Sequence, residues 1–265
     1  MKKINLKVIY IVLLVCGTML LNSSASAQPA GTVNFLSNIK VYNLSGLWRA
    51  DQLKLLSLKE TEQFPEPLGV LGKNYQRFYI HYTAVKKDLG NPYVYHVTGK
   101  TRVGKQVRPF TGTITVKQAG TYKAGSPYAP EPYKGYIRGQ IICRVVLKEA
   151  ISPAGSGIIN GELISDFCIN AQGQFLYDTL DYGMDGYGNN QFTGTHTVYN
   201  SKIVQNLQYG DISFSDSRFN DTYGITVPAE YEKYGWQSFV NAISNDNRPA
   251  SKAAIAEEKR QWWKE

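Results

Sequence analysis

The sequence predicts a mainly β protein, an antiparallel meander closed as a barrel, with a short helical segment at its C-terminal end. Three observations favour this class. Short runs of alternating apolar and polar residues are separated by glycine-rich or polar turns, which is typical of strands with one buried face. Strand-favouring residues are abundant, with 19 Tyr and 10 Phe among 265 residues. Charged residues make up only 19%, which argues against a coiled coil, and the aromatic content argues against disorder.

Residues 1–27 resemble a secretory signal peptide. Three lysines lie among the first seven residues, and the apolar run 8–15 is too short to span a bilayer of about 30 Å. Residues 25–27 are Ala-Ser-Ala, the small-residue pattern of a cleavage site. We therefore expect cleavage before Gln28 and an exported protein, either periplasmic or extracellular, with no transmembrane span left after cleavage.

Lipid attachment at Cys16 is the alternative, and it is disfavoured because Val15 before it is not small. Loss of three lysines with the signal peptide leaves 26 basic against 21 acidic residues, a net charge of +5 instead of +8. A charge this modest, with no clustered basic face, excludes ordinary nucleic-acid binding. We expect no nucleic-acid partner.

The mature chain divides into a linker at 28–41, a β-barrel domain at 42–245 and a helical tail at 246–265. Strands are expected at 45–56, 76–86, 93–103, 106–118, 135–149, 157–169, 174–182, 191–199 and 201–208. A helix is expected from Pro228 to Val240, because proline and acidic residues suit the first turn. We also expect 251–265 to be an exposed helix with Trp262 and Trp263 near its tip.

Glycines recur at one phase within the predicted strands, each with apolar or aromatic neighbours about two positions away. Because side chains alternate along a strand, the glycines and these neighbours share one face, which we interpret as the interior. Repeated glycine on the inner face allows a small barrel to coil and close. The instances are Gly46, Gly99, Gly112, Gly139, Gly161 and Gly194.

Cys143 and Cys168 remain after signal cleavage, and an exported protein could join them. A hairpin of strands 136–149 and 157–169 would place Cys143 opposite Leu163 or Ile164, and Cys168 opposite about Gly139. Gly139 lies four residues from Cys143 along the same strand, so the two cysteines would be too far apart to form a disulfide. Two buried thiols are therefore favoured over a disulfide.

The stretch Asp185–Gly194 reads Asp-Gly-Tyr-Gly-Asn-Asn-Gln-Phe-Thr-Gly. Together with segments 107–114, 209–211 and 231–236, it resembles an uncharacterised family of small exported proteins of Bacteroidota-type bacteria. The resemblance covers roughly residues 90–242 and implies export and a β fold, but no activity. Relatives tend to carry Trp where this chain has His196 and Tyr209.

Residues 46–49, Gly-Leu-Trp-Arg, are similar to the entry strand of lipocalin- and avidin-type barrels. In those barrels the tryptophan closes one end. This resemblance implies that Trp48 is buried at one end of a lipocalin-like barrel.

No catalytic, metal or cofactor site follows from the motifs. There is no Gly-x-Ser-x-Gly elbow, phosphate loop or dinucleotide fingerprint, and the three histidines lack metal-ligand spacing. Glu162 and Asp166, about 13 Å apart along a strand, are too far apart for a glycosidase pair. The stretch from Asp181 to Asn189 resembles a calcium loop but lacks the EF-hand ligands at its third and twelfth positions.

We therefore expect an exported, non-enzymatic barrel that binds a small ligand, a glycan or a protein partner in the cell envelope. The alternatives are an exported hydrolase with an unrecognised carboxylate site and an immunity-type interaction protein. Asp185–Gly194 is either a structural turn or the mouth of the barrel. The candidate ligand-binding residues are Trp48, Asp185, Tyr187, Asn190 and His196.

Overall fold

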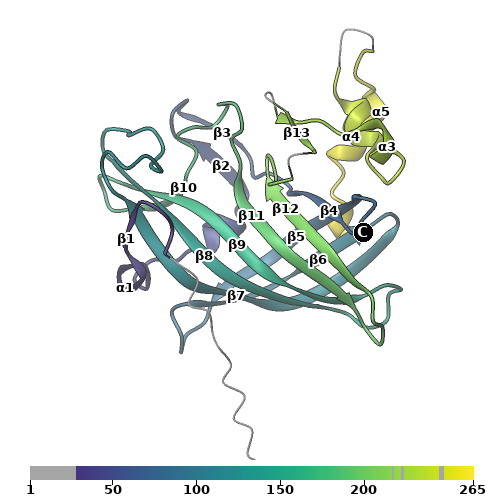
Figure 1. Cartoon of the computed structure of the whole chain (residues 1–265), viewed down its shortest axis with the longest axis horizontal. Coiled ribbons are helices and arrows are strands. Elements are labelled where there is room, and N and C mark those ends of the chain that lie inside the picture. The colour runs from purple at the N-terminus through teal and green to yellow at the C-terminus, as the bar shows by residue number, and fades with distance from the viewer. Residues whose placement is uncertain (1–27, 217, 222–223, 245–247) are drawn as a thin grey trace, which may run out of the picture.

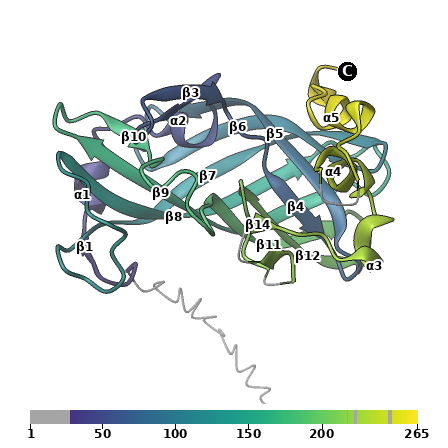
Figure 2. The same cartoon turned by 90° about the horizontal axis from the view of Figure 1, so that it is seen from above.

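The computed structural model describes residues 28–265 except 217, 222–223 and 245–247, so the expected signal peptide and Cys16 lie outside the described residues. The expected mainly β, antiparallel fold is confirmed. Eight strands form a ring in which each pairs antiparallel with the next and the last pairs with the first (Figures 1 and 2). In ring order they are β4 (Leu68–Leu71), β5 (Gln76–Lys87), β6 (Val94–Val103), β7 (Gln106–Tyr122), β8 (Tyr136–Glu149), β9 (Gly157–Asn170), β11 (Asn189–Val198) and β12 (Val204–Asp211).

The expected strand at 45–56 is wrong in its first half. Residues Ser45–Trp48 form the short helix α2, and only Gln52–Leu55 is a strand, β2, which pairs with β3 (Glu60–Gln63) outside the ring. Leu44, Leu47 and Trp48 are all buried. Their spacing of three and four residues places them on one side of a helix turn, so helical burial overrides the strand-like alternation.

Strand β4 closes the ring and was not among the strands expected from the sequence. It has only four residues, too few for alternation to show. It pairs with Gln76–Phe78 of β5 on one side and with Leu207–Gly210 of β12 on the other. Ring closure therefore depends on its shortest strand.

Two other regions differ from expectation. The stretch 174–182 contains only the three-residue strand β10 (Phe175–Tyr177), which pairs with β9. The stretch expected as a linker contains β1 (Thr32–Asn34), paired with β7, and helix α1 (Leu36–Ile39).

Phenylalanine rings lie against four of the ring-strand glycines, Gly99, Gly139, Gly161 and Gly194. A Cβ on Gly99 would lie 2.1 Å from the His81 carbonyl oxygen and 2.5 Å from the ring of Phe110. The ring of Phe192 similarly lies against Gly161 and Gly194. The glycines thus let aromatic rings pack flat against the sheet. Gly46 is the exception, because it belongs to α2 and has open space around it.

The chain after β12 forms a second, smaller core against the outer face of β4. Val70 packs there with Phe214, Phe219 and Trp236, while its neighbour Leu71 faces the main core, as strand alternation requires. The elements of this part are β13 (Asn220–Asp221), β14 (Gly224–Ile225), α3 (Ala229–Glu232), α4 (Gln237–Ala242), α5 (Lys252–Glu258) and the 3-10 turn η1 (Trp262–Lys264). Helices α3 to α5 lie at one end of the long axis, opposite α1 and β1 (Figures 1 and 2).

The hairpin of β8 and β9 has the expected register at one cysteine. Cys143 lies opposite Leu163, as expected, and Cys168 lies opposite Arg138, one position from the expected Gly139. Both thiols are buried and neither is in a disulfide within the described part of the chain.

Candidate functional site

A cavity of about 370 Å³ lies beside β4, between β5 and β12. β4 pairs with these strands only as far as Phe78 and Gly210. β5 continues past this point to Lys87, whereas β12 continues by a single residue, Asp211. Segment 64–67 borders the cavity here, between β3 and β4. The volume is within the 300–1,000 Å³ typical of small-molecule sites. Five aromatic side chains contribute to the lining, Trp48, Phe64, Tyr82, Tyr209 and Trp263.

Asp211 is the buried acidic group of this cavity. Along β12, Leu207, Tyr209 and Asp211 are all buried, because residues two apart share a face. Only Oδ2 of Asp211 is hydrogen-bonded: it accepts from Asn190 Nδ2 at 2.6 Å and from the Tyr177 hydroxyl at 3.1 Å. Its Oδ1 has no hydrogen-bond partner in the described part of the chain. Burial raises the pKa of Asp211 to about 7.

A bulge in β11 turns Asn190 toward the cavity. The register of β11 against β12 shifts between Asn189 and Phe192, and Asn190 has a φ of +50°, a left-handed conformation that asparagine tolerates well. The side chain of Asn189 bridges the adjacent β9 backbone, accepting from Asp166 N at 2.7 Å and donating to Asp166 O at 3.0 Å. The two asparagines thus stabilise a local bend, and bulges of this kind often lie beside functional sites.

A chain of hydrogen bonds connects Trp48 to Asp211. Trp48 Nε1 donates to Ser165 Oγ at 3.0 Å, and Ser165 Oγ donates to Asn190 Oδ1 at 2.6 Å. Asn190 Nδ2 then donates to Asp211 and also to the Leu47 carbonyl at 2.7 Å. The side-chain polar atoms of Trp48, Ser165 and Asn190 are all hydrogen-bonded, and this network holds the Asp211 carboxyl in place. Oδ1 of Asp211 is the atom of the network that has no partner among the described residues.

Two tyrosines lie above the buried floor of the cavity. The hydroxyls of Tyr82 and Tyr209 are 2.8 Å apart, and the ring of Tyr209 stacks on Phe192 with centroids 4.6 Å apart. Burial raises the pKa of both phenols well above the usual value. Both hydroxyls therefore stay neutral at physiological pH.

The rim of the cavity consists of a histidine, a glutamate and the end of the chain. His81 Nδ1 lies 2.8 Å from Glu66 Oε1. The ring of His81 stacks on Trp263 with centroids 3.9 Å apart and an angle of 9° between planes. The C-terminal segment is thus part of the cavity wall.

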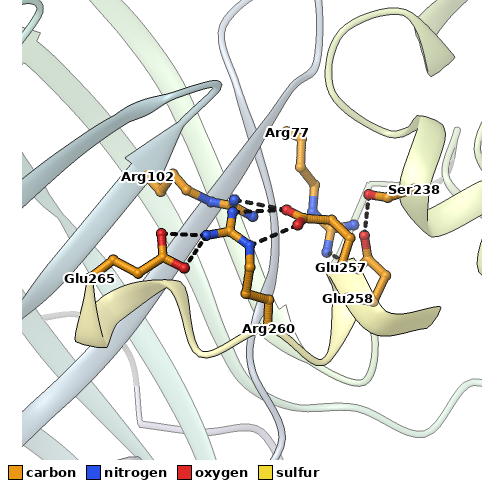
Figure 3. A network of polar contacts seen from close by, with 7 residues as sticks. All are labelled: Arg77, Arg102, Ser238, Glu257, Glu258, Arg260 and Glu265. Carbon is orange, nitrogen blue, oxygen red and sulfur yellow. Dashed lines mark hydrogen bonds and ion pairs between the residues drawn. The ribbon is translucent and has the colours of Figure 1, made fainter. Parts of the chain in front are cut away.

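The C-terminal tail packs on the outer face of β5 and β6, in contrast to the exposed helix that we expected. Trp262 is buried, with its ring 6.0 Å from that of Tyr79. Buried arginines of the ring strands hold the tail: Arg77 lies 3.2 Å from Glu258 and Arg102 lies 3.0 Å from Glu257 (Figure 3). The strands contribute arginines and the tail contributes glutamates, and the attraction between these opposite charges helps to hold residues 252–265 on the ring.

Only two of the five predicted binding residues, Trp48 and Asn190, line this cavity. Asp185 is exposed and Tyr187 is half-buried, and both border a different hollow on the other side of the sheet, beside Asp178 and Arg138. The Tyr187 hydroxyl donates to the Asp178 carbonyl at 2.6 Å. Tyr187 therefore helps to hold the loop after β10.

The candidate His196 also lies away from the cavity and is neither a surface residue nor part of its lining. It is buried, with Nε2 2.9 Å from Glu149 Oε2. Glu149 also accepts hydrogen bonds from Thr101 Oγ1 and from the backbone N–H of Gly157. This is a buried polar cluster that connects β6, β8, β9 and β11.

The predicted calcium-type loop does not gather ligands. Asp181 pairs instead with Arg138, at 2.6 Å, and among the described residues no group of three or more metal-binding side chains comes together. Glu162 is exposed and points outward, as expected. None of the helices that the structure describes is long and apolar enough to cross a membrane.

Asp211 and Glu66, which line the cavity, were not among the predicted site residues. One signal was available for Asp211. The alternation Leu207, Tyr209, Asp211 continues past the predicted strand end at 208, and extending the strand by three residues would have placed an acid on the inner face. Glu66 had no such signal, because it lies in a segment between short strands.

Comparisons of this chain with models of protein families, with curated proteins and with solved structures found no match.

Proposed function

We propose that the ring of eight strands acts as a lipocalin-like barrel of an exported protein and binds a small organic ligand in the cavity beside β4. One observation carries this proposal. Asp211 is buried with one carboxyl oxygen fixed by two donors and the other without a partner in the described residues, at the floor of an aromatic-lined cavity.

The energetics of Asp211 support a functional role. Leaving a buried polar group unsatisfied costs about 1–3 kcal/mol, and more for a charged group. A shifted pKa in a cleft is also more frequent at functional sites than elsewhere. A ligand group that hydrogen-bonds to Oδ1 would recover this cost on binding.

The test of binding uses the neutral fluorescent probe N-phenyl-1-naphthylamine, whose emission rises in apolar pockets. We expect saturable binding to the purified protein. The half-buried Ala50 lines the cavity, and Ala50→Trp should fill it and abolish binding. The matched control Ala124→Trp, at an exposed turn, should bind the probe like the unaltered protein. Probe binding that is equal in both variants, or absent throughout, would contradict the proposal.

Export is a separate part of the proposal, supported by the sequence of residues 1–27. Mass spectrometry of the protein recovered from its native cell envelope should give a chain that begins at Gln28. A lipid-modified Cys16 or an intact residue 1 would contradict it.

The second candidate function is hydrolysis of a glycosidic bond, and one observation favours it. Asp211 and Glu66 line the same cavity, and burial raises the pKa of Asp211 to about 7. Glycosidases pair a protonated acid with an ionised carboxylate. Release of nitrophenolate from a panel of 4-nitrophenyl glycosides at pH 6, lost in both Asp211→Asn and Glu66→Gln, would establish this candidate. No turnover across the panel would leave binding as the function.

A further inference from the structure

We infer that the ligand is a small organic cation, an alkyl- or arylalkylammonium, with Asp211 as its counter-ion. This inference rests on the proposed binding function and names the chemistry of its ligand. Charge, hydrogen bonding and the lining of the cavity each support it.

The first support is the absence of a cation beside Asp211. Its hydrogen-bond partners are an amide and a phenol, and the charged group that acts on it is another acid, Glu66. Three basic side chains reach the cavity among the described residues, and one of them, His81, lies 2.8 Å from Glu66 at the rim. Arg49 is half-exposed and lies 3.6 Å from Asp51, while Lys264 is exposed at the rim. Among the described residues, none of these basic side chains forms an ion pair with Asp211, so this buried acid of the cavity lining lacks a protein counter-ion.

The second support is the orientation of the carboxyl. Both donors bind Oδ2, so Oδ1 is the carboxyl oxygen that lacks a hydrogen-bond partner among the described residues. An ionised carboxylate with two donors already in place accepts a third hydrogen bond or an ion pair at its free oxygen. A cationic ligand would also remove the cost of burying the charge, because a buried charge is stable only when paired.

The third support is the aromatic lining. Trp48, Phe64, Tyr82 and Tyr209 line the cavity that contains Asp211. Aromatic faces attract organic cations, and Trp and Tyr do so most strongly. One of the Tyr82 and Tyr209 hydroxyls donates to the other, which leaves one O–H proton of the pair available, and both residues contribute their aromatic rings to the lining. Several aromatic rings around one carboxylate suit a quaternary or bulky ammonium better than a small hydrated ion.

The experiment compares choline with 3,3-dimethyl-1-butanol, its uncharged isostere, by calorimetry on the purified protein at pH 8. The two probes differ only by nitrogen against carbon, so any difference in Kd reports the charge. We expect choline to bind at least ten-fold more tightly. This comparison needs no variant, so it tests the inference even if a substitution prevents folding.

Two isosteric substitutions then locate the effect. Asp211→Asn keeps an oxygen to accept from Asn190 and Tyr177, and it should reduce the affinity for choline at least ten-fold and remove the preference for choline over its uncharged isostere. The matched control is Asp166→Asn. Burial raises the pKa of Asp166 as well, to about 6, but Asp166 does not line this cavity, so choline binding should not change.

Each other outcome contradicts a different statement. Equal Kd values for choline and its isostere, with the fluorescent probe still bound, would overturn the cation inference and leave the proposed function in place. Equal loss of choline binding in Asp211→Asn and Asp166→Asn would overturn Asp211 as the counter-ion. Absence of binding by choline, its isostere and the fluorescent probe would overturn both the inference and the proposed function.

Discussion

At the scale of single residues, Asp211 and Trp48 are the two ends of one hydrogen-bonded chain through Ser165 and Asn190. Trp48 was identified from a short Gly-x-Trp pattern, and its burial agrees with that prediction even though it lies on a helix and not on a strand. Substitution of Asp211 and substitution of Trp48 should therefore each have a measurable effect on stability.

Asp211 should make stability depend on pH. Because burial raises its pKa in the folded protein to about 7, above the value of about 3.9 in an unfolded chain, the folded state binds the proton more tightly. Its contribution to the free energy of unfolding is therefore complete below about pH 4 and is lost as the pH rises through 7. Urea titrations at pH 4.5 and 7.5 should show the unaltered protein losing stability relative to Asp211→Asn, by up to about 1.4 kcal/mol per pH unit. A pH-independent difference would contradict this assignment.

Trp48 should contribute several kcal/mol to folding. Trp48→Ala removes a buried ring and its hydrogen bond to Ser165, and we expect it to cost about 3–5 kcal/mol in denaturant titration. Trp48→Phe keeps most of the apolar volume and loses the donor, so its cost should be nearer 1 kcal/mol. A cost below about 1 kcal/mol for the alanine variant would rule out a packing role.

At the scale of elements, the glycines of the ring strands and the glycine of α2 have different structural surroundings. Gly99, Gly139, Gly161 and Gly194 each leave room for a neighbouring carbonyl and a phenylalanine ring, whereas Gly46 faces open space. The sequence pattern treated the two alike, because both occur in an apolar–x–Gly–x–apolar context. Only the helical spacing of Leu44, Leu47 and Trp48 separates them.

This difference predicts opposite results for two glycine-to-alanine changes. Gly99→Ala would place a Cβ 2.1 Å from the His81 carbonyl oxygen, and the overpacking should cost about 1–3 kcal/mol. Gly46→Ala should be neutral or stabilising by up to about 1 kcal/mol, because alanine suits a helix better. Thermal melting of both variants checks this pair. A destabilised Gly46→Ala would argue against the helix at 45–48.

At the scale of the whole molecule, much of the ring could be predicted and the cavity could not. Alternation and turn residues predicted β5 to β9, β11 and most of β12, since these strands are long and half-buried. The features that form the cavity carry no periodic signal. These are a four-residue strand, a bulge that turns Asn190 inward, and a tail whose Trp263 stacks on His81. Each depends on contacts between segments distant in the sequence.

Docking of the tail on the ring should depend on its buried ion pair. Arg77 is 3% exposed and pairs with Glu258, so Glu258→Gln leaves a buried guanidinium without its counter-charge and should cost about 1–3 kcal/mol. Glu265 pairs with Arg260 at an exposed position, so the matched control Glu265→Gln should change stability by less than about 0.5 kcal/mol. Equal urea midpoints for the two variants would contradict this account of the tail.

The central claim is that Asp211 is a buried carboxyl that faces a ligand. Its most direct test is ¹³C NMR of the Asp211 carboxyl carbon, titrated with and without saturating choline and assigned with Asp211→Asn. We predict a pKa near 7 for the protein alone, because burial dominates, and a clear fall with choline, because a nearby cation favours the ionised form. A pKa near 4 in both titrations would contradict the account.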